Sequence, residues 1–471
     1  MSRGKELIKN TAIIAIGKVC TKFLSFFLLP FYTAVLSRED YGVVDLINTY
    51  ISLLLPLIVF QIEDAIFRYT IDVRQQEKEK RKVISTSFFF CFMQAIIFTG
   101  VFGIIFWIID IPYGEYLYIN VIISIFSGML LQLTRGLGDN TAYAFCSFLT
   151  AAIAILLNMV FILVFHMGAE GLFITSFISN LIGVIYILYK ERLFPFIRLR
   201  WFDKILLKNM LSYSLPLVPN TLSWWVIGAS DKTVVTWFLG SAQNGILSVS
   251  QKFSTVYTTF YSIYNLSWTE NAAVHKNDCD SEQYYSDIID TSFRVLAAAC
   301  IGIIAVVALA FPLLVNIKFD DSYYQIPIYM LSSFVYSVIG IYSVVYIAYK
   351  KTANIAKTSM AAAAINLLLN VLLKRYIGLY AASISSVVAY VVILAIRYFD
   401  IKKFVKIRTD KKLAVSVACM MVIQFITYYI RDFWISLVNM FVVTLYAIYL
   451  NRGFLREIIS FLKNKMEEQK S

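Results

Sequence analysis

The sequence predicts an all-α polytopic membrane protein with about 14 transmembrane helices. Hydrophobic residues make up 59% of the 471 residues and charged residues only 15%, and the mean hydropathy is +0.71. Long, nearly charge-free runs recur along the whole chain, separated by short segments that hold most of the Lys and Arg. About 20 apolar residues are needed to cross a hydrocarbon core of roughly 30 Å, so each run can form one spanning helix.

The apolar runs place the predicted helices in order along the chain. The run 355–373 is short, so twelve or thirteen crossings also fit the pattern. The predicted helices cover residues 11–36, 42–62, 84–109, 116–134, 142–165, 171–189, 212–239, 246–268, 292–316, 325–348, 355–373, 379–397, 413–430 and 433–450.

Charge distribution predicts that both termini are cytoplasmic. With that orientation the outer loops hold few basic residues: Arg38, Lys318, Lys374, Arg375 and Arg431. Cytoplasmic loops of membrane proteins collect Lys and Arg, so the remaining excess belongs inside. The basic segments Arg74–Lys82, Lys190–Lys208 and Arg397–Lys412 are then expected to bind anionic lipid head groups. The net charge of +12 is therefore not read as a nucleic-acid surface.

Three segments between or after the spans have a character of their own. Residues 190–211 and 452–471 alternate basic and apolar side chains, which predicts amphipathic helices on the cytoplasmic surface. The longest predicted loop, Thr269–Thr291, contains Asp278-Cys279-Asp280 and is expected to be a solvated acidic loop. No predicted loop is long enough for a separate catalytic domain.

Short motifs recur in the same order in the two halves of the chain. Leu36–Gly42 (LSREDYG) resembles Leu239–Gly245 (LGSAQNG), and Lys9-Asn10 resembles Lys208-Asn209. Further on, Leu156–Asn158 and Gly171-Leu172 match Leu368–Asn370 and Gly378-Leu379. The separations predict a parallel repeat of two six-helix lobes followed by two extra helices. The predicted parts are a lobe at 1–189, a linker at 190–211, a lobe at 212–400, two helices at 401–451 and a tail at 452–471.

Motifs that carry catalysis or bind metal are absent from the sequence. There is no GxxxxGK[ST], HExxH, GxSxG or CxxC pattern, and the six cysteines show no paired spacing. We therefore expect no cofactor, no metal site and no enzymatic activity. Transport is the function that such a chain predicts.

Charges inside the predicted helices are the strongest functional signal. Lys18 and Lys22 lie one turn apart in the first helix, and a lysine at the bilayer centre costs roughly 2.5–3.5 kcal/mol. Lys252 interrupts the eighth helix. Together these residues predict a cationic cavity, which suits an anionic ligand such as a phosphate. Lys252 could instead snorkel to the nearer interface.

Charges near the helix ends extend this pattern. Arg68 and Arg135 are expected to flank the inner mouth of the cavity, with Asp64 placed four residues before Arg68 to pair with it. Asp231-Lys232 interrupts the seventh helix. Asp231 is the best buried carboxylate for a coupling ion, unless the adjacent Lys232 simply neutralises it; Lys232 could also be an intrahelical counter-charge or snorkel.

Several of these motifs together resemble one transporter family. The Lys-bearing first helix, Leu36–Gly42, Ala65–Tyr69 (AIFRY), Arg135–Gly138 (RGLG) and Asp231-Lys232 are similar to the polysaccharide flippase branch of the multidrug/oligosaccharidyl-lipid/polysaccharide exporter superfamily. The resemblance implies transport of undecaprenyl-diphosphate-linked oligosaccharide from the inner to the outer leaflet of the bacterial plasma membrane by alternating access. It implies that Lys18, Lys22 and Lys252 face the diphosphate. Glycosyltransferases and a polymerase of the same pathway would be its partners.

Three alternatives remain open at the level of sequence. A drug or cation antiporter of the same superfamily shares the fold but calls for carboxylates in the lobes. A lipid-linked peptidoglycan precursor flippase also has a cationic cavity. A membrane glycan polymerase or ligase usually carries a long external loop with catalytic residues, which this sequence lacks.

Overall fold

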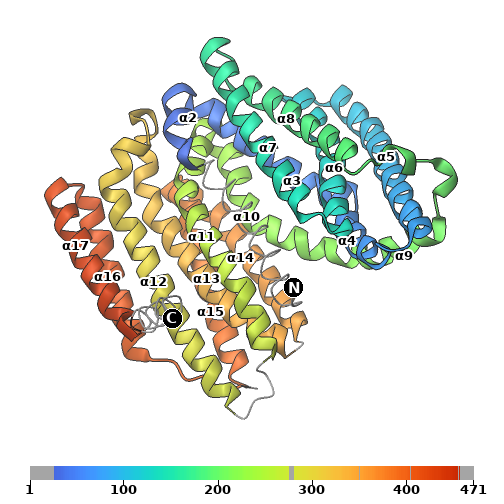
Figure 1. Cartoon of the computed structure of the whole chain (residues 1–471). Coiled ribbons are helices and arrows are strands. Elements are labelled where there is room, and N and C mark those ends of the chain that lie inside the picture. The colour runs from blue at the N-terminus through green and yellow to red at the C-terminus, as the bar shows by residue number, and fades with distance from the viewer. Residues whose placement is uncertain (1–25, 275–279, 350, 404, 454–455, 457–471) are drawn as a thin grey trace, which may run out of the picture. The chain divides into compact units, whose positions relative to one another are not determined.

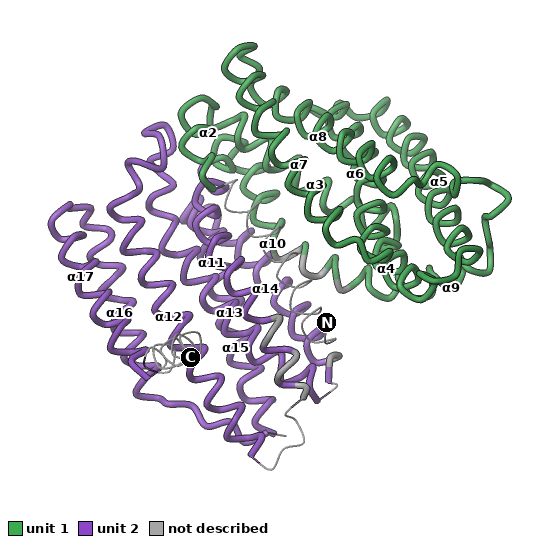
Figure 2. Tube along the Cα trace, in the orientation of Figure 1, with its two compact units in different colours: residues 1–245 green, residues 246–471 purple. Residues whose placement is uncertain are grey.

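The computed structural model describes residues 26–274, 280–349, 351–403, 405–453 and 456, and this part of the chain is helical without strands (Figure 1). The chain forms two compact units, Met1–Gly245 and Ile246–Ser471 (Figure 2). Eleven helices among the described residues are long and apolar enough to cross a membrane. The predicted all-α membrane fold is confirmed.

Unit 1 contains the helices that carry most of the predicted site. They are α2 (Leu29–Val35), α3 (Arg38–Ile58), α4 (Ile62–Asp72), α5 (Glu77–Ile108), α6 (Gly114–Leu137), α7 (Asn140–Met159), α8 (Ala169–Lys190), α9 (Lys204–Ser214) and α10 (Val218–Leu239), with the short turns η1 (Val160–Val164), η2 (Phe194–Phe196), η3 (Leu199–Trp201) and η4 (Leu215–Leu217).

Unit 2 begins within a long helix, α11, whose first five residues still belong to unit 1. Its helices are α11 (Ser241–Val274), α12 (Ser281–Leu314), α13 (Ile326–Ala348), α14 (Thr352–Ile377), α15 (Tyr380–Ile401), α16 (Lys411–Ile430) and α17 (Phe433–Leu450), with the 3₁₀ segment η6 (Ile317–Gln325) before α13. By contacts the division falls at Gly245, whereas the predicted lobes meet at residues 190–211; the lobe boundaries stay a prediction.

Every predicted span from 42–62 onward coincides with a helix, but two boundaries differ in an instructive way. The predicted span 42–62 is interrupted, because α3 ends at Ile58 and Phe60 and Gln61 adopt left-handed backbone angles of φ 52° and 55°. Pro56 already removes one backbone donor from the last turns of α3. A short second helix, α4, therefore starts in a new direction at Ile62.

The prediction of a solvated acidic loop at Thr269–Thr291 is wrong. α11 continues to Val274 and α12 begins at Ser281, so most of this segment is helical. Apolar runs mark the part of a helix that lies in lipid, whereas polar turns that extend beyond it carry no hydropathy signal. The linker 190–211 holds two 3₁₀ turns and the start of α9, capped by Asp203, whose carboxylate accepts hydrogen bonds from the amides of Ile205 and Leu206. The predicted tail helix lies almost entirely outside the described residues.

The core of unit 1 is built where α4 packs on α6. Two glycines of α6 allow this close approach: a Cβ atom at Gly128 would collide with the carboxylate of Glu63, and one at Gly136 would lie 2.6 Å from Cβ of Thr70. Buried side chains from both helices, including Ile66 and Leu133, fill the contact. Steric fit therefore sets the α4–α6 distance.

The two C-terminal helices are fastened to the rest of unit 2. α16 and α17 both pack against α12. The rings of Tyr323 and Tyr428 stack with centroids 4.1 Å apart, and each hydroxyl donates to the backbone carbonyl of the other residue, at 3.0 and 3.1 Å. Arg431 adds an ion pair with Asp320. The helices that follow the predicted repeat are thus part of one compact unit.

Arg397, predicted at the start of a basic loop, is instead buried in unit 2 with 1% of its surface exposed. Its guanidinium donates to Thr358 Oγ1 (3.0 Å), Ser359 Oγ (2.9 Å) and the Ile355 carbonyl (3.2 Å), and also to Ser343 Oγ. It forms no ion pair with any carboxylate in the described part of the chain. Four neutral acceptors from α13 and α14 therefore replace water around this cation.

Because a lysine cannot reproduce this fork of donors, Arg397→Lys is expected to lower the stability of the protein by about 1–3 kcal/mol. The thermal unfolding midpoint of the detergent-solubilised protein measures the effect. Arg408→Lys is the matched control, since Arg408 is exposed. Equal midpoints for the two variants would show that the buried hydrogen bonds of Arg397 contribute nothing.

Candidate functional site

One face of α3 carries backbone and side-chain groups that bind α10 and the start of α11. Gly42, Asp45 and Thr49 are three and four residues apart and so lie on the same side of the helix. The helix begins after Ser37, whose hydroxyl accepts a hydrogen bond from the Asp40 amide at 3.0 Å. The cap fixes where α3 begins, and Gly42 lies near this N-terminal end of the face that contacts α10 and α11.

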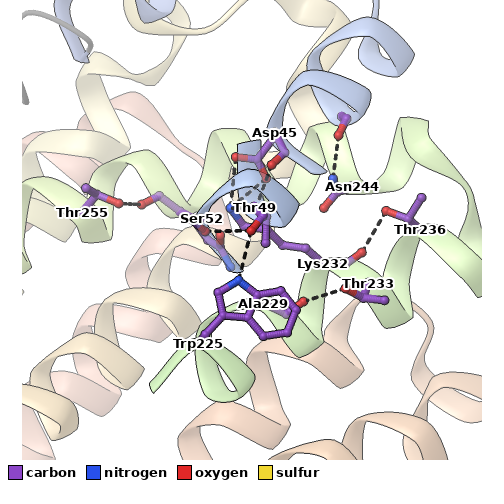
Figure 3. A network of polar contacts seen from close by, with 12 residues as sticks. Asp45, Thr49, Ser52, Trp225, Ala229, Lys232, Thr233, Thr236, Asn244 and Thr255 are labelled. Atoms are coloured by element: carbon purple, nitrogen blue, oxygen red, sulfur yellow. Dashed lines mark hydrogen bonds and ion pairs between the residues drawn. The ribbon is translucent and has the colours of Figure 1, made fainter. Parts of the chain in front are cut away.

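Lys232 of α10 forms an ion pair with Asp45 of α3. Its Nζ lies 2.8 Å from Asp45 Oδ2, 3.0 Å from Oδ1 and 3.5 Å from Thr49 Oγ1 (Figure 3). The two side chains are only 17% and 21% exposed. The predicted intramembrane charge of Lys232 is therefore balanced by a carboxylate from another helix.

Two neutral hydrogen bonds extend the contact in both directions. Trp225 Nε1 donates to the Thr49 carbonyl at 3.0 Å, and Asn244 Nδ2 donates to the Gly42 carbonyl at 2.8 Å (Figure 3). We call the set Gly42, Asp45 and Thr49 on α3 with Asn244, Lys232 and Trp225 the polar seam. Its contacts join residues that lie 176 to 202 positions apart in the sequence.

The polar seam fixes α10 against α3 because separating its charged pair would leave each charge without a partner. Charges are strongly attracted in a medium of low dielectric constant, and leaving one partner of a buried pair alone costs about 3–5 kcal/mol. Lipid offers no hydrogen bonds to replace those that Trp225 and Asn244 make. Separating the helices at this face would require water or new partners.

The end of the polar seam is a close crossing of the two related motifs. A Cβ atom at Gly42 would collide with the Ser241 carbonyl and lie 2.7 Å from the Gly245 amide nitrogen. A Cβ atom at Gly245 would collide with the Arg38 carbonyl and lie 3.3 Å from the Gly42 amide nitrogen. Gly42 and Gly245 hold the same position in the predicted repeat, as do Arg38 and Ser241, so the crossing is symmetric.

Asp231, the predicted coupling carboxylate, is 3% exposed on α10 and has interactions within the described structure. The partner that Figure 3 shows for the neighbouring Lys232 is Asp45. Sequence reasoning missed Asp45 altogether. Its signal was available, since a carboxylate in a predicted span is unusual, but nothing in the sequence tells which lysine it meets.

The predicted pairing of Asp64 with Arg68 was wrong. Arg68 points toward the other end of α4 and pairs with Asp72 at 2.6 Å, with both side chains about half exposed at 51% and 55%. Asp64 instead accepts a hydrogen bond from Gln61 Nε2 at 3.1 Å. Both i,i+4 spacings exist in this helix, and the backbone break before Ile62 leaves Gln61 beside Asp64.

Arg135 of α6 lies at the contact between α4 and α6, against Phe67 of α4. Its guanidinium stacks 4.4 Å from the ring centre of Phe67 and 5.6 Å from that of Tyr143, and donates to Gln132 Oε1 at 3.1 Å. It makes no ion pair with a carboxylate of the described residues, and its Nε is buried without an acceptor there. Arg135 is thus a cation held by aromatic rings.

The remaining predicted site residues are separated from this group. Lys252 is half-buried on α11 in unit 2 and forms no ion pair within the described ranges. Lys18 and Lys22 lie outside the described residues. The structure places Arg68 in a pair with Asp72, Arg135 against Phe67 and Tyr143, and Lys232 in the polar seam, and the role of Lys18, Lys22 and Lys252 stays a prediction.

Metal ligands do not gather anywhere in the described ranges, where no group of three or more His, Cys, Asp or Glu side chains forms a cluster. The arrangement in unit 1 offers cations, hydroxyls and aromatic rings rather than a reactive pair. Such groups bind and orient a charged ligand.

Neutralising one partner of the polar seam is expected to be worse than neutralising both. Asp45→Asn or Lys232→Met leaves a buried charge without its partner and should lower the free energy of unfolding by about 3–5 kcal/mol. The double variant should lose less than the sum of the two single losses. Thermal unfolding in detergent gives the comparison. Asp72→Asn is the control, because its exposed pair with Arg68 is worth at most about 1 kcal/mol. If the stability losses of the two single variants simply add in the double variant, the coupling between Asp45 and Lys232 is refuted.

The symmetric crossing makes a second, steric prediction. Gly42→Ala and Gly245→Ala each push a methyl group into backbone and should cost about 1–3 kcal/mol in the same unfolding assay. Gly103→Ala on α5 is the control, since a Cβ atom there meets nothing within 4 Å and alanine favours the helix by about 0.5–1 kcal/mol. Unchanged stability of both crossing variants would contradict the close approach.

Solved structures of two kinds of transporter share this fold. A lipid II flippase, MurJ, in an inward closed conformation matches with a TM-score of 0.69 and 14% identity, over 95% of this chain and 100% of the other. A multidrug resistance MATE family transporter of the MOP superfamily matches in its inward-facing conformation with a TM-score of 0.67 and 14% identity, over 83% and 98%. Its outward-facing conformation matches at 0.59 and 15%, over 83% and 93%.

No curated protein matches the sequence. A family model described as polysaccharide biosynthesis protein matches residues 7–268, which include the predicted first span, all described residues of unit 1 and most of α11. The predicted resemblance to a polysaccharide transporter family is therefore confirmed. The chain belongs to the polysaccharide biosynthesis protein family, with the fold of MOP-superfamily transporters.

Proposed function

We propose that this protein is a flippase that moves an undecaprenyl-diphosphate-linked oligosaccharide from the inner to the outer leaflet of a bacterial plasma membrane. The family match over residues 7–268 carries the proposal, because it joins this transporter fold to polysaccharide biosynthesis. The fold similarity to a lipid II flippase supports a lipid-linked substrate. Glycosyltransferases and a polymerase of the same pathway would supply and use that substrate.

Cations that the fold leaves unneutralised would bind the diphosphate. Lys252 and Arg135 form no ion pair with described carboxylates, and Lys18 and Lys22 lie in the predicted first span. A lysine is a compact point charge that suits phosphate, and Arg135 keeps its guanidinium oriented by stacking on Phe67. Lys232 is assigned a different task, since its charge is already paired with Asp45.

The polar seam would serve the alternating-access cycle. It holds α10 and the start of α11 on α3, and in the predicted orientation its Gly42 end faces outward. A substrate cavity has to open to the cytoplasm for the diphosphate to enter from inside. Opening outward would then require the ion pair and the glycine crossing to separate or to move together.

A lipid-linked peptidoglycan precursor flippase is the second candidate, favoured by the similarity to MurJ. A drug or cation antiporter is supported by the MATE fold. The three differ in what accumulates when the protein is absent. Lipid-linked surface-glycan precursor, peptidoglycan precursor and drug sensitivity are separate measurements.

Deletion of the protein is expected to abolish surface glycan and to accumulate lipid-linked oligosaccharide in the inner leaflet. Lys22→Gln and Lys252→Gln should each reduce display strongly, because a buried diphosphate loses a counter-charge. Lys78→Gln, at an exposed position on α5, is the control for membrane insertion and expression. Surface glycan is quantified with inner-leaflet precursor in the same cells.

The outcomes separate the function from the site. Normal surface glycan in the deletion strain would refute the flippase function, and peptidoglycan precursor accumulating instead would favour the second candidate. Normal display in the Lys22→Gln and Lys252→Gln strains would refute only the role of those lysines.

A further inference from the structure

Unit 2 contains a mostly apolar cavity of about 390 Å³ between α15 and the beginning of α16. Side chains of α12 and α13 form its floor, and the wall includes Phe293, Val338, Ile341, Val391, Leu394 and Leu413. This volume lies within the range of roughly 300–1,000 Å³ found for sites that hold small molecules. The substrate cations discussed above do not line it.

The cavity exists because the chain does not return along α15. After α15, residues 405–410 lie against the start of α12, where the Lys406 amide donates to Glu282 Oε1 at 3.1 Å and the Arg408 amide to Ser286 Oγ at 3.0 Å. α16 therefore packs against α12 and α17. A wedge remains open beside α15.

The mouth of the cavity is polar and basic. The Tyr398 hydroxyl is hydrogen-bonded to Thr409 Oγ1 at 3.1 Å and to Lys402 Nζ, which lies 3.9 Å from the centre of the Tyr398 ring. Lys411, the first residue of α16, lines the cavity beside these groups. Both lysines are exposed.

The two carboxylates at the same mouth have backbone or cationic partners, whereas neither lysine is paired with a carboxylate. Asp410 caps α16 by accepting hydrogen bonds from the amides of Lys412 (2.9 Å) and Leu413 (3.2 Å). Asp290 lies beside Arg294 and the backbone of Asp410. Neither Lys402 nor Lys411 forms an ion pair with a carboxylate of the described chain. Above the apolar wall the mouth therefore holds two lysine charges that no described carboxylate pairs with, beside the carboxylates of Asp290 and Asp410.

We propose that this cavity binds an anionic phospholipid, with one acyl chain in the apolar wedge and the phosphate between Lys402 and Lys411. The apolar wall removes the lipid's acyl chain from water. Basic pockets between transmembrane helices attract anionic head groups. The predicted orientation puts the mouth on the cytoplasmic side, where such lipids are available. The bound lipid fills the wedge that residues 405–410 leave beside α15.

Native mass spectrometry of the purified full chain, titrated with phosphatidylglycerol or with phosphatidylcholine of the same acyl chains, tests the site. Phosphatidylglycerol is expected to bind about tenfold more tightly. Lys402→Gln combined with Lys411→Gln should lower its affinity to that of phosphatidylcholine. Ala395→Trp, which fills the cavity, should weaken both lipids.

Lys403→Gln is the matched control from the same basic segment, because Lys403 is also exposed but its charge is paired with Asp400 at 3.2 Å. It should leave the preference for phosphatidylglycerol unchanged. An unchanged preference in the double lysine variant, or unchanged binding in Ala395→Trp, would overturn the proposal. Displacement of phosphatidylglycerol by an equal amount of polyprenyl phosphate would also overturn it, by assigning the wedge to a prenyl chain. Binding in detergent needs no transport, so this result is independent of the flippase function.

Discussion

A charge inside a membrane protein needs a partner from the protein itself, and unit 1 is organised around one such pair. Lys232 and Asp45 would each be costly alone in a low-dielectric environment, and together they tie α10 to α3. Arg397 meets the same constraint differently in unit 2, where three hydroxyls and a carbonyl surround it without a carboxylate in the described part of the chain. Arg135 and Lys252 have neither arrangement among the described residues, since no carboxylate there pairs with them and Arg135 is held by the rings of Phe67 and Tyr143.

Hydropathy predicted where helices lie because lipid-facing surface must be apolar; the described part of the chain has a helix at each predicted span from 42–62 onward, and eleven helices are long and apolar enough to cross a membrane, α10 and α11 not among them. It could not predict the break at Phe60 and Gln61, which depends on backbone angles rather than composition. Nor could it follow α11 and α12 into their polar turns, since helices outside lipid need no apolar run.

Partners of the site residues were beyond the sequence for a different reason. Local spacing offered Arg68 two carboxylates at four residues, and only the fold shows that Asp72 is the one it meets. Asp45 lies 187 residues from Lys232, so no local rule connects them. Arg397 stands at the end of an apolar run and was therefore predicted as the first residue of a basic loop. Its place in the sequence does not tell whether its side chain faces solvent or, as in the structure, the protein interior.

The symmetric crossing of Gly42 and Gly245 has a consequence for the origin of this chain. Gly42 approaches the backbone of Ser241, and Gly245 approaches the backbone of Arg38, which holds the equivalent position in the repeat. An isologous interface between two identical subunits has the same reciprocal contacts. If the predicted repeat arose by duplication, a half-length ancestor would have dimerised through this contact before the two copies were fused. Fusion would then have freed the copies to diverge, so that Asn244 donates to Gly42 while the corresponding position of the first copy holds Tyr41.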